Sequence, residues 1–367
     1  MRDGRVDSLA RILVEYSTAV KEGDVVVIQG SSAGEPLIHS VYEHVLTAGG
    51  HPIVQMSFEG QQATYLSRAS DTQLQWVSPP SRWAAEEADV SIAIGADLNT
   101  RELSQVPPER QMKRRAATKD LMEIVMDRAA KGEHRWVYTL LPTHAYASDA
   151  EMSLEQFESF YFRACLTHDS DPVTAWKRQS AETERLCAWS QGHGEVHVEG
   201  PGTDITLGIE GRTFIAADGK HNMPDGEFFT GPIEDSVEGE VSFHLPSVIG
   251  GREVDGVRLS FEAGKVVDAS AERGEPFLIE LLDTDEGARR LGELGIGTNY
   301  GIERGTKDVL LDEKIGGTVH LAVGKSYPET GGVNDSAVHT DMVCDLRQGG
   351  RITVDGEVLQ ENGRFVV

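Results

Sequence analysis

Residues 24–58, DVVVIQGSSAGEPLIHSVYEHVLTAGGHPIVQMSF, begin and end with short apolar runs, at 24–30 and 51–58. Runs of this length are typical of buried strands in a parallel sheet. Between them lie apolar residues at helical spacing: Leu37, Ile38, Val41, Val45 and Leu46. The pair Gly49-Gly50 that follows is typical of a helix end. The stretch therefore predicts a strand–helix–strand unit with parallel strands.

The same alternation continues along the first half of the chain, with further apolar runs at 89–96 (DVSIAIGA) and 135–142 (RWVYTLLP). We predict an N-terminal domain over residues 1–190 that is built on an open α/β sheet. The segment 28–36, IQGSSAGEP, lacks the G-x-G-x-x-G spacing that brings backbone close to a pyrophosphate. We therefore expect a plain strand-to-helix turn there rather than a dinucleotide site.

The second half differs in composition, because all five Trp residues precede residue 190 whereas 30 of the 39 glycines follow it. Alternating apolar and polar residues after that point predict strands. Three dipeptides predict hairpin turns: Asp255-Gly256, Asp355-Gly356 and Asn362-Gly363. We predict a β-rich α+β catalytic domain over residues 191–367. One inserted helix, DEGARRLGEL (285–294), is expected to lead into Glu293.

Charge limits the class of partner. The chain has 60 Asp and Glu against 34 Lys and Arg, a net charge of −26. Nucleic acids and anionic membranes both require a basic surface, so neither is expected as a partner. The three cysteines lie far apart and form no metal or disulfide pattern. The N-terminus has no signal-peptide pattern and no run is long enough to span a bilayer, so we expect a cytoplasmic protein.

The chemistry of the chain is concentrated between Glu293 and Asp341. Glu293 lies among apolar residues, and a buried carboxylate is costly unless it is paired or binds a metal. His320 lies in a strand pattern, where a lone histidine is more often a core residue. His339 and Asp341 change that balance, because side chains two apart on a strand share one face. Imidazole with carboxylate suits Zn, Mn, Fe or Co rather than Ca.

Three further residues near this cluster also have ordinary structural explanations. Glu227 follows a Pro-Asp-Gly turn and, taken alone, reads as a solvated loop residue. Glu313 can simply pair with the adjacent Lys314, and Tyr327 can be a strand-end tyrosine. The chain has no H-E-x-x-H or P-loop motif. A metal-activated water is therefore the predicted reaction type.

Four motifs occur in the order NMPDGEFFTGPIEDSVEGEV (222–241), LGELGIGTN (291–299), DEKIGGTVHLAVGKSYPETGG (312–332) and VHTDMV (338–343). With them the chain resembles the M29 metallo-aminopeptidases, the family that includes aminopeptidases T and S. The N-terminal half resembles that family more diffusely. The resemblance implies an N-terminal α/β domain, a β-rich catalytic domain and a homodimer that hydrolyses the N-terminal residue of peptides.

The same resemblance implies a site for two divalent ions, which could be Zn, Co, Mn or Mg. The ligands that it implies are Glu227, Glu293, Glu313, His320, His339 and Asp341. Tyr327 is implied beside them as a catalytic group, and Glu313 as a catalytic base. Glu227 and Glu313 enter this set through the resemblance alone. The spacers between Glu293 and Glu313 and between His320 and His339 are shorter than is typical of the family.

An alternative function uses fewer ligands. Ring-cleaving dihydroxypyridine dioxygenases resemble the same family and hold one Fe(II) by two histidines and one carboxylate. His320, His339 and Asp341 would satisfy such a triad. A two-metal hydrolase also needs Glu227 and Glu293, and their presence favours the peptidase. A metal-binding protein without catalysis is a third alternative, against which the presence of Glu313 and Tyr327 argues.

Overall fold

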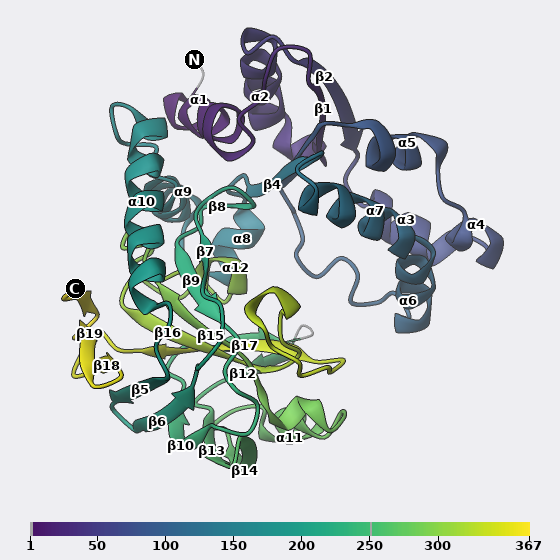
Figure 1. Cartoon of the computed structure of the whole chain (residues 1–367). Helices are drawn as coiled ribbons and strands as arrows, with labels where there is room; N and C mark the ends of the chain where they lie inside the picture. The colour runs from purple at the N-terminus through teal and green to yellow at the C-terminus, as the bar shows by residue number, and fades with distance from the viewer. Residues whose placement is uncertain (1–2, 250–251) are drawn as a thin grey trace. The chain divides into compact units, whose positions relative to one another are not determined.

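The computed structural model describes residues 3–249 and 252–367, which divide into two compact units (Figure 1). Unit 1 comprises residues 1–176 and 219–223, and unit 2 comprises residues 177–218 and 224–367. The division falls within helix α10 (Pro172–Ser190) rather than after it. The expected domains 1–190 and 191–367 stay a prediction.

Unit 1 is built on a parallel sheet in the order β2-β1-β3-β4-β8. The strands are β1 (Val25–Ser31), β2 (His51–Ser57), β3 (Val90–Gly95), β4 (Arg135–Leu140) and β8 (Asn222–Met223). Four of them match the apolar runs of the sequence, but β2 is an edge strand with no buried residue, so the expectation of a buried strand is wrong for residues 51–58. Helix α2 (Glu35–Thr47) connects the first two strands, so the strand–helix–strand prediction is confirmed.

The remaining helices of unit 1 precede, separate or follow these strands along the chain. The N-terminal helix α1 (Gly4–Arg11) continues as a π-helical segment, Ile12–Ser17, whose apolar side chains are buried. The others are α3 (Gln61–Arg68), α4 (Asp71–Gln75), α5 (Pro79–Glu87), α6 (Pro108–Ala117), α7 (Lys119–Ala130), α8 (His144–Asp149) and α9 (Leu154–Ala164). Within residues 3–249 and 252–367, none of the helices is both long and apolar enough to cross a bilayer.

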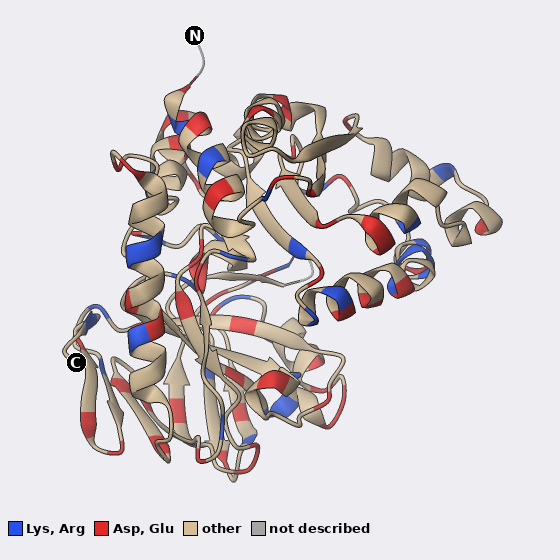
Figure 2. Cartoon of the chain, turned by 45° about the horizontal axis from the view of Figure 1, so that its top comes forward, with Lys and Arg blue, Asp and Glu red and all other residues tan. Residues whose placement is uncertain are grey.

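Basic side chains gather on α6, where blue segments follow one another in Figure 2. Two of these arginines donate hydrogen bonds to backbone oxygens within unit 1. Arg110 donates to the backbone oxygens of Leu66 and Ala69, and Arg114 donates to that of Trp76. These guanidinium groups therefore hold the C-terminal ends of α3 and α4 against α6.

Unit 2 contains two antiparallel sheets and a short hairpin. The first sheet has the order β14-β13-β10-β6-β5-β18-β19-β20, and the second has the order β17-β16-β15-β9-β7. The first sheet consists of β5 (Glu195–Gly200), β6 (Thr203–Gly208), β10 (Glu238–Ser242), β13 (Arg258–Glu262), β14 (Lys265–Ser270), β18 (Arg351–Val354), β19 (Glu357–Glu361) and β20 (Arg364–Phe365). The second consists of β7 (Ile215–Ala217), β9 (Glu227–Thr230), β15 (Leu291–Gly297), β16 (Thr318–Gly324) and β17 (His339–Asp345). Strands β11 (Ser247–Ile249) and β12 (Arg252–Val254) form the hairpin, and one apolar core spans the unit.

The predicted fold class, an α/β unit followed by a β-rich unit, is confirmed. Two local predictions are wrong. Residues 285–294 do not form one helix, because Gly287–Arg289 is a single 3₁₀ turn and Leu291–Gly297 is a fully buried strand between β9 and β16. The helices of this half are instead α11 (Glu275–Leu282) and α12 (Val309–Asp312). Asp255-Gly256 joins strands of different sheets, since β12 pairs with β11 and β13 pairs with β10.

Candidate metal centre

Four neighbouring strands of the second sheet carry five of the six predicted ligands. Glu227 lies on β9, Glu293 on β15, His320 on β16, and His339 and Asp341 on β17. Although these residues span more than a hundred positions of sequence, antiparallel pairing brings them to one sheet. The alternating placement of side chains on a strand puts His339 and Asp341 on the same face.

Small residues lie opposite the predicted ligands in the strand register. Gly297 pairs with Glu227, Gly295 pairs with His320, and Gly324 pairs with His339. Ala322 pairs with Glu293 on one side and with Asp341 on the other. Side chains directly opposite each other on antiparallel strands are within contact distance, so bulky residues here would fill the space that the ligand groups occupy.

Gly295 shows how close this packing is. A Cβ atom built on Gly295 would lie 2.0 Å from Cε1 and 2.1 Å from Nε2 of His320. Because ordinary contacts are no closer than about 3.4 Å, only glycine allows the imidazole to lie where it does. His320 on the next strand therefore explains Gly295, whereas a Cβ atom on Gly292 or Gly297 would instead meet backbone oxygens of neighbouring segments.

Glu313 reaches the site from outside the sheet. It caps the C-terminus of α12, and its backbone oxygen accepts a hydrogen bond from Nδ1 of His320 at 3.1 Å. The short helix α12 is itself held by Asp308, whose side chain accepts from the amide of Leu310. The backbone of residue 313 therefore orients one imidazole while its carboxylate joins the site.

The predicted ligands form two groups of three. In each group, Glu227–Glu313–His320 and Glu293–His339–Asp341, one ligand atom per residue lies within 4.8 Å of the others. Glu293 also links the groups, because its Oε1 lies 3.5 Å from Nε2 of His320 and its Oε2 lies 3.3 Å from Nε2 of His339. The structure thus brings all six residues together.

Both imidazoles present the same nitrogen to the carboxylates. Nδ1 of His320 bonds to the oxygen of Glu313, and Nδ1 of His339 bonds to the oxygen of Lys325 at 2.8 Å. A backbone oxygen can only accept, so Nδ1 carries the proton in each ring. Nε2 is then left for the interior of the site, which is the arrangement that metal-binding histidines use.

Burial and the charges of neighbouring groups shift the pKa values of the carboxylic acids in the site. Burial raises the pKa of Glu227 to about 8 and that of Asp341 to about 6. Burial also disfavours the charged form of Glu293, but hydrogen bonds from His320 and His339 outweigh it and lower the pKa of Glu293 to about 2. Carboxylates that share one buried space thus differ widely in their affinity for protons.

The pKa values of the two imidazoles shift in the direction opposite to that of an isolated buried histidine. Burial alone would lower both pKa values, yet the hydrogen bond to Glu293 and the nearby carboxylates raise that of His320 to about 10 and that of His339 to about 9. The excess of negative charge here is therefore compensated by protons, and a divalent cation could replace them.

Two carboxylate oxygens support a metal at this site. Glu227 Oε2 and Asp341 Oδ1 are buried, and neither has a hydrogen-bond partner within residues 3–249 and 252–367, although Nε2 of His320 lies 3.5 Å from Glu227 Oε2. A buried polar atom without a partner costs roughly 1–3 kcal/mol, more if charged, so such atoms call for an explanation. One orphaned oxygen belongs to each ligand group, and the mixed N/O donors suit a divalent transition metal.

Lys314 is a member of the site that the sequence did not reveal. It is fully buried, and its Nζ lies 3.2 Å from Glu227 Oε1 and also contacts Glu313 Oε1. The pairing of Glu313 with Lys314, an ordinary explanation for that carboxylate, therefore coexists with its place in a ligand group. The available signal was the apolar residues that flank the charged triplet in LLDEKIGG, since a lysine that is buried there needs a charged partner.

Tyr327 lies at the edge of the site. Its ring packs edge-on against His339, with centroids 5.1 Å apart, and tilts against Phe229 at 5.6 Å. Burial and the charges of Glu293 and Asp341 raise the pKa of the Tyr327 hydroxyl. The hydroxyl therefore keeps its proton at neutral pH and can act as a donor.

Known proteins resemble this chain over nearly its whole length. Aminopeptidase T of Thermus aquaticus is 26% identical over 411 residues, covering 99% of this chain and 98% of that protein. The solved structure of wild-type AmpT from Thermus thermophilus matches with a TM-score of 0.85 and 25% identity, covering 99% of each chain. The 2,5-dihydroxypyridine dioxygenase of Pseudomonas putida KT2440 matches with a TM-score of 0.61 over 99% of this chain and 97% of that one. At 14% identity, that match shows a shared fold alone. The model of the thermophilic metalloprotease (M29) family matches residues 2–365, and the chain therefore belongs to that family, as its motifs predicted.

Proposed function

We propose that this chain is a metal-dependent aminopeptidase that removes the N-terminal residue of peptides at a site for two divalent ions. The observation that carries the proposal is the pair of ligand groups, Glu227–Glu313–His320 and Glu293–His339–Asp341, which Glu293 links. The relatives named aminopeptidase support the substrate class. Which metal binds is left to measurement, with Zn, Co, Mn and Mg as candidates.

Bound divalent ions would polarise the scissile carbonyl and lower the pKa of a bound water. The residues of the chain supply the rest of the mechanism. Glu313 would accept the proton of the water and pass it to the leaving amine. Lys314 contacts one carboxylate oxygen of Glu313, so the other oxygen is the one left for this role. As Glu313 also belongs to a ligand group, a second carboxylate would share the task.

The Tyr327 hydroxyl would donate a hydrogen bond to the substrate oxygen on which negative charge develops. Its ring lies beside His339, and its raised pKa keeps the donor protonated. A donor placed where charge develops stabilises the transition state more than the ground state.

The homodimer implied by the resemblance and the cytoplasmic location both remain part of the proposal. Light scattering would measure the oligomeric state.

The dioxygenase alternative fits the geometry less well. Its triad would take His320 from one ligand group and His339 with Asp341 from the other. Glu293 contacts both imidazoles, so a triad that omits it would leave a buried carboxylate between the ligands. The likeness to the solved dioxygenase concerns the fold, not this arrangement.

The test combines metal content with activity. The purified chain is stripped with a chelator, reloaded with Zn, Co, Mn or Mg, and assayed with aminoacyl 4-nitroanilides. We expect about two ions per chain and amide hydrolysis that disappears with the ions and returns with them. The Glu293→Gln variant should lose both the bound ions and the activity. Glu357 is an exposed carboxylate on β19, so the Glu357→Gln variant should retain both.

A second arm of the test supplies Fe²⁺, oxygen and 2,5-dihydroxypyridine. Oxygen uptake with ring cleavage would assign the chain to the alternative. Full peptidase activity in the stripped protein would contradict the metal-dependent mechanism.

A further inference from the structure

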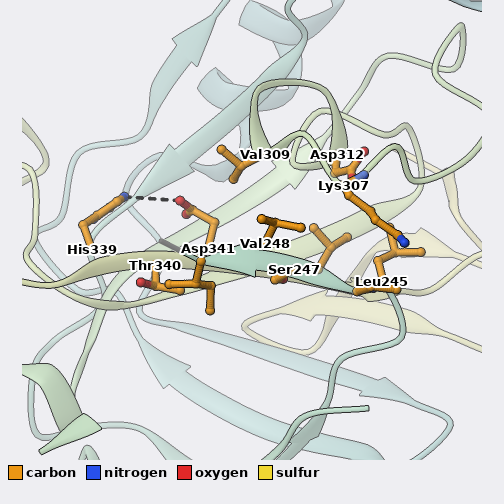
Figure 3. Close-up of a pocket in the computed structure, with 12 residues that line it drawn as sticks. Leu245, Ser247, Val248, Lys307, Val309, Asp312, His339, Thr340 and Asp341 are labelled. Carbon is orange, nitrogen blue, oxygen red and sulfur yellow. Dashed lines mark hydrogen bonds and ion pairs between the residues drawn. The ribbon is translucent and has the colours of Figure 1, made fainter. Parts of the chain in front are cut away.

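The pocket beside His339 and Asp341 (Figure 3) belongs to the metal centre already described. A separate pocket of about 460 Å³ lies within unit 1, to which all the residues that line it belong. It opens where β1 and β2 end at Ser31 and Ser57, and where Asp97 follows β3. The direction of the strand order changes between β1 and β3, and in open parallel sheets ligands bind beyond the carboxyl ends of the strands at such a point. The position and the size of this pocket are therefore those of a ligand site.

Aromatic side chains form one part of the wall. Phe58 follows β2, Tyr65 lies on α3 and Trp76 follows α4, and Figure 1 shows α3 and α4 next to α6. The exposed fraction is 64% for Phe58 and 57% for Trp76. Rings of this size gain much from being covered, so their exposure on a concave surface indicates a ligand that covers them.

Carboxylates form another part of the wall, contributed by Glu59, Asp97 and Glu102. The hydroxyl of Tyr146 donates to Oδ2 of Asp97 at 3.0 Å and so fixes the position of that carboxylate. Burial, followed by the charges of Glu59 and Asp97, raises the pKa of Glu102. These carboxylates thus lie close enough to repel one another, and a cation bound among them would relieve the repulsion.

Arg114 is the one cationic side chain among the described residues that line this pocket, and it is already engaged. Its Nη1 donates to the backbone oxygen of Trp76 at 2.6 Å, and its guanidinium lies 5.5 Å from the centroid of the Tyr65 ring. Lys113, which precedes it on α6, is paired with Asp71 at 2.6 Å. An anion would therefore meet the carboxylates without a free cationic partner, so the charges of the pocket favour a cation.

We propose that this pocket binds an organic cation, a guanidinium or alkylammonium group on an aliphatic stem, between the carboxylates of Asp97 and Glu102 and the ring of Trp76. A carboxylate offers such a group a charge-assisted hydrogen bond, and an aromatic face attracts its charge. The aliphatic stem covers apolar ring surface, which a hydrated metal ion would leave exposed. Both free amines and the basic side chains of peptides carry this chemistry. The proposal does not rest on the metal centre of unit 2.

The experiment measures binding to the metal-loaded full chain by titration calorimetry, so that ions occupy the carboxylates of the metal centre. The cationic probes are agmatine and acetyl-Ala-Arg-Ala-amide, whose acetyl group removes the N-terminal amine of the peptide. The neutral comparison is acetyl-Ala-Gln-Ala-amide. We expect saturable binding of a cationic probe with a Kd of about 1 mM or lower, weaker binding at higher ionic strength, and no binding of the neutral peptide.

Two variants test the wall of the pocket. Trp76→Ala and Glu102→Gln should each weaken binding of the cationic probe by about tenfold, a typical effect of losing one cation–π contact or one charged partner. Trp83→Ala and Glu109→Gln are the matched controls and should bind as wild type does. Trp83 is 40% exposed on α5, Glu109 is exposed on α6, and neither lines the pocket. Thermal unfolding shows whether each variant is folded.

The two cationic probes distinguish the sources of the ligand. Binding of agmatine alone would support the site with a free amine as its ligand, and binding of the arginine peptide alone would support it with a basic side chain. The proposal would be overturned if neither probe bound saturably up to about 10 mM or if the neutral peptide bound equally well. Unchanged binding in folded Trp76→Ala and Glu102→Gln would also overturn it.

Discussion

Replacing Gly295 with alanine should remove His320 from the site with the smallest possible change of side chain. The added Cβ would lie 2.0 Å from Cε1 of His320, where about 3.4 Å is the normal limit. The ring must therefore move by about 1.4 Å, the difference between these two distances. The imidazole is fully buried and bonds to Glu313 at 3.1 Å, so a shift of that size breaks this bond.

The expected magnitude follows from the displaced ligand. Loss of the groups that orient a metal-binding histidine typically costs 10–100-fold in metal affinity, and a misplacement of about 1 Å costs on the order of 100-fold in rate. Overpacking itself should destabilise the fold by about 1–3 kcal/mol. We therefore expect Gly295→Ala to remain folded, to bind one ion weakly, and to lose at least about 100-fold in kcat/KM.

The assay is a metal titration alongside hydrolysis of aminoacyl 4-nitroanilides. Gly194→Ala is the matched control, because a Cβ there meets only Oδ1 of Asp355 at an ordinary 3.5 Å. The double variant Gly295→Ala/His320→Ala should bind metal and hydrolyse substrate as well as His320→Ala alone, because the clash requires the imidazole. Wild-type metal affinity and stoichiometry in a folded Gly295→Ala would refute the reasoning.

Three further predictions concern charge and donors in the same site. Lys314→Met should destabilise the ion-free protein by about 3–5 kcal/mol at pH 9, above the pKa of Glu227, because it leaves buried carboxylates uncompensated. Urea unfolding with and without metal checks this, and an equal loss in both states would show that Lys314 only fills space. The ion-free protein should lose stability as pH rises from about 6.5 to about 10, because both imidazoles hold protons with pKa values of about 10 and 9 when folded but near 6.5 when unfolded. Metal binding at pH 7 should accordingly release at least two protons, measured by calorimetry in two buffers, and no proton release would contradict these pKa values. Tyr327→Phe should lower turnover by roughly 100- to 1,000-fold with unchanged metal content, and unchanged turnover would exclude Tyr327 from the mechanism.

Local patterns in the sequence were enough for much of the fold. Apolar runs predicted the parallel strands β1, β2, β3 and β4 of unit 1, although the edge strand β2 is not buried, and the two-residue strand β8 had no such run. Asp355-Gly356 and Asn362-Gly363 predicted the turns of the last hairpins, and all four residues have the positive φ that such turns require. The residue types between 293 and 341 likewise indicated metal chemistry, since imidazole and carboxylate together suit divalent transition metals.

Other features depend on strands that are distant in the sequence. Residues 285–294 resemble a helix locally, yet pairing with β9 and β16 makes Leu291–Gly297 a strand. The division of the ligands into two groups follows from strand register, which no local pattern specifies. Lys314 is adjacent to Glu313 in the sequence, but its ion pair with Glu227 arises only where α12 meets β9. The sequence by itself thus indicated histidine and carboxylate groups for one site, and the register of β9, β15, β16 and β17 determined which of those on the strands lie close together, because distances between strands are set only when the sheet forms.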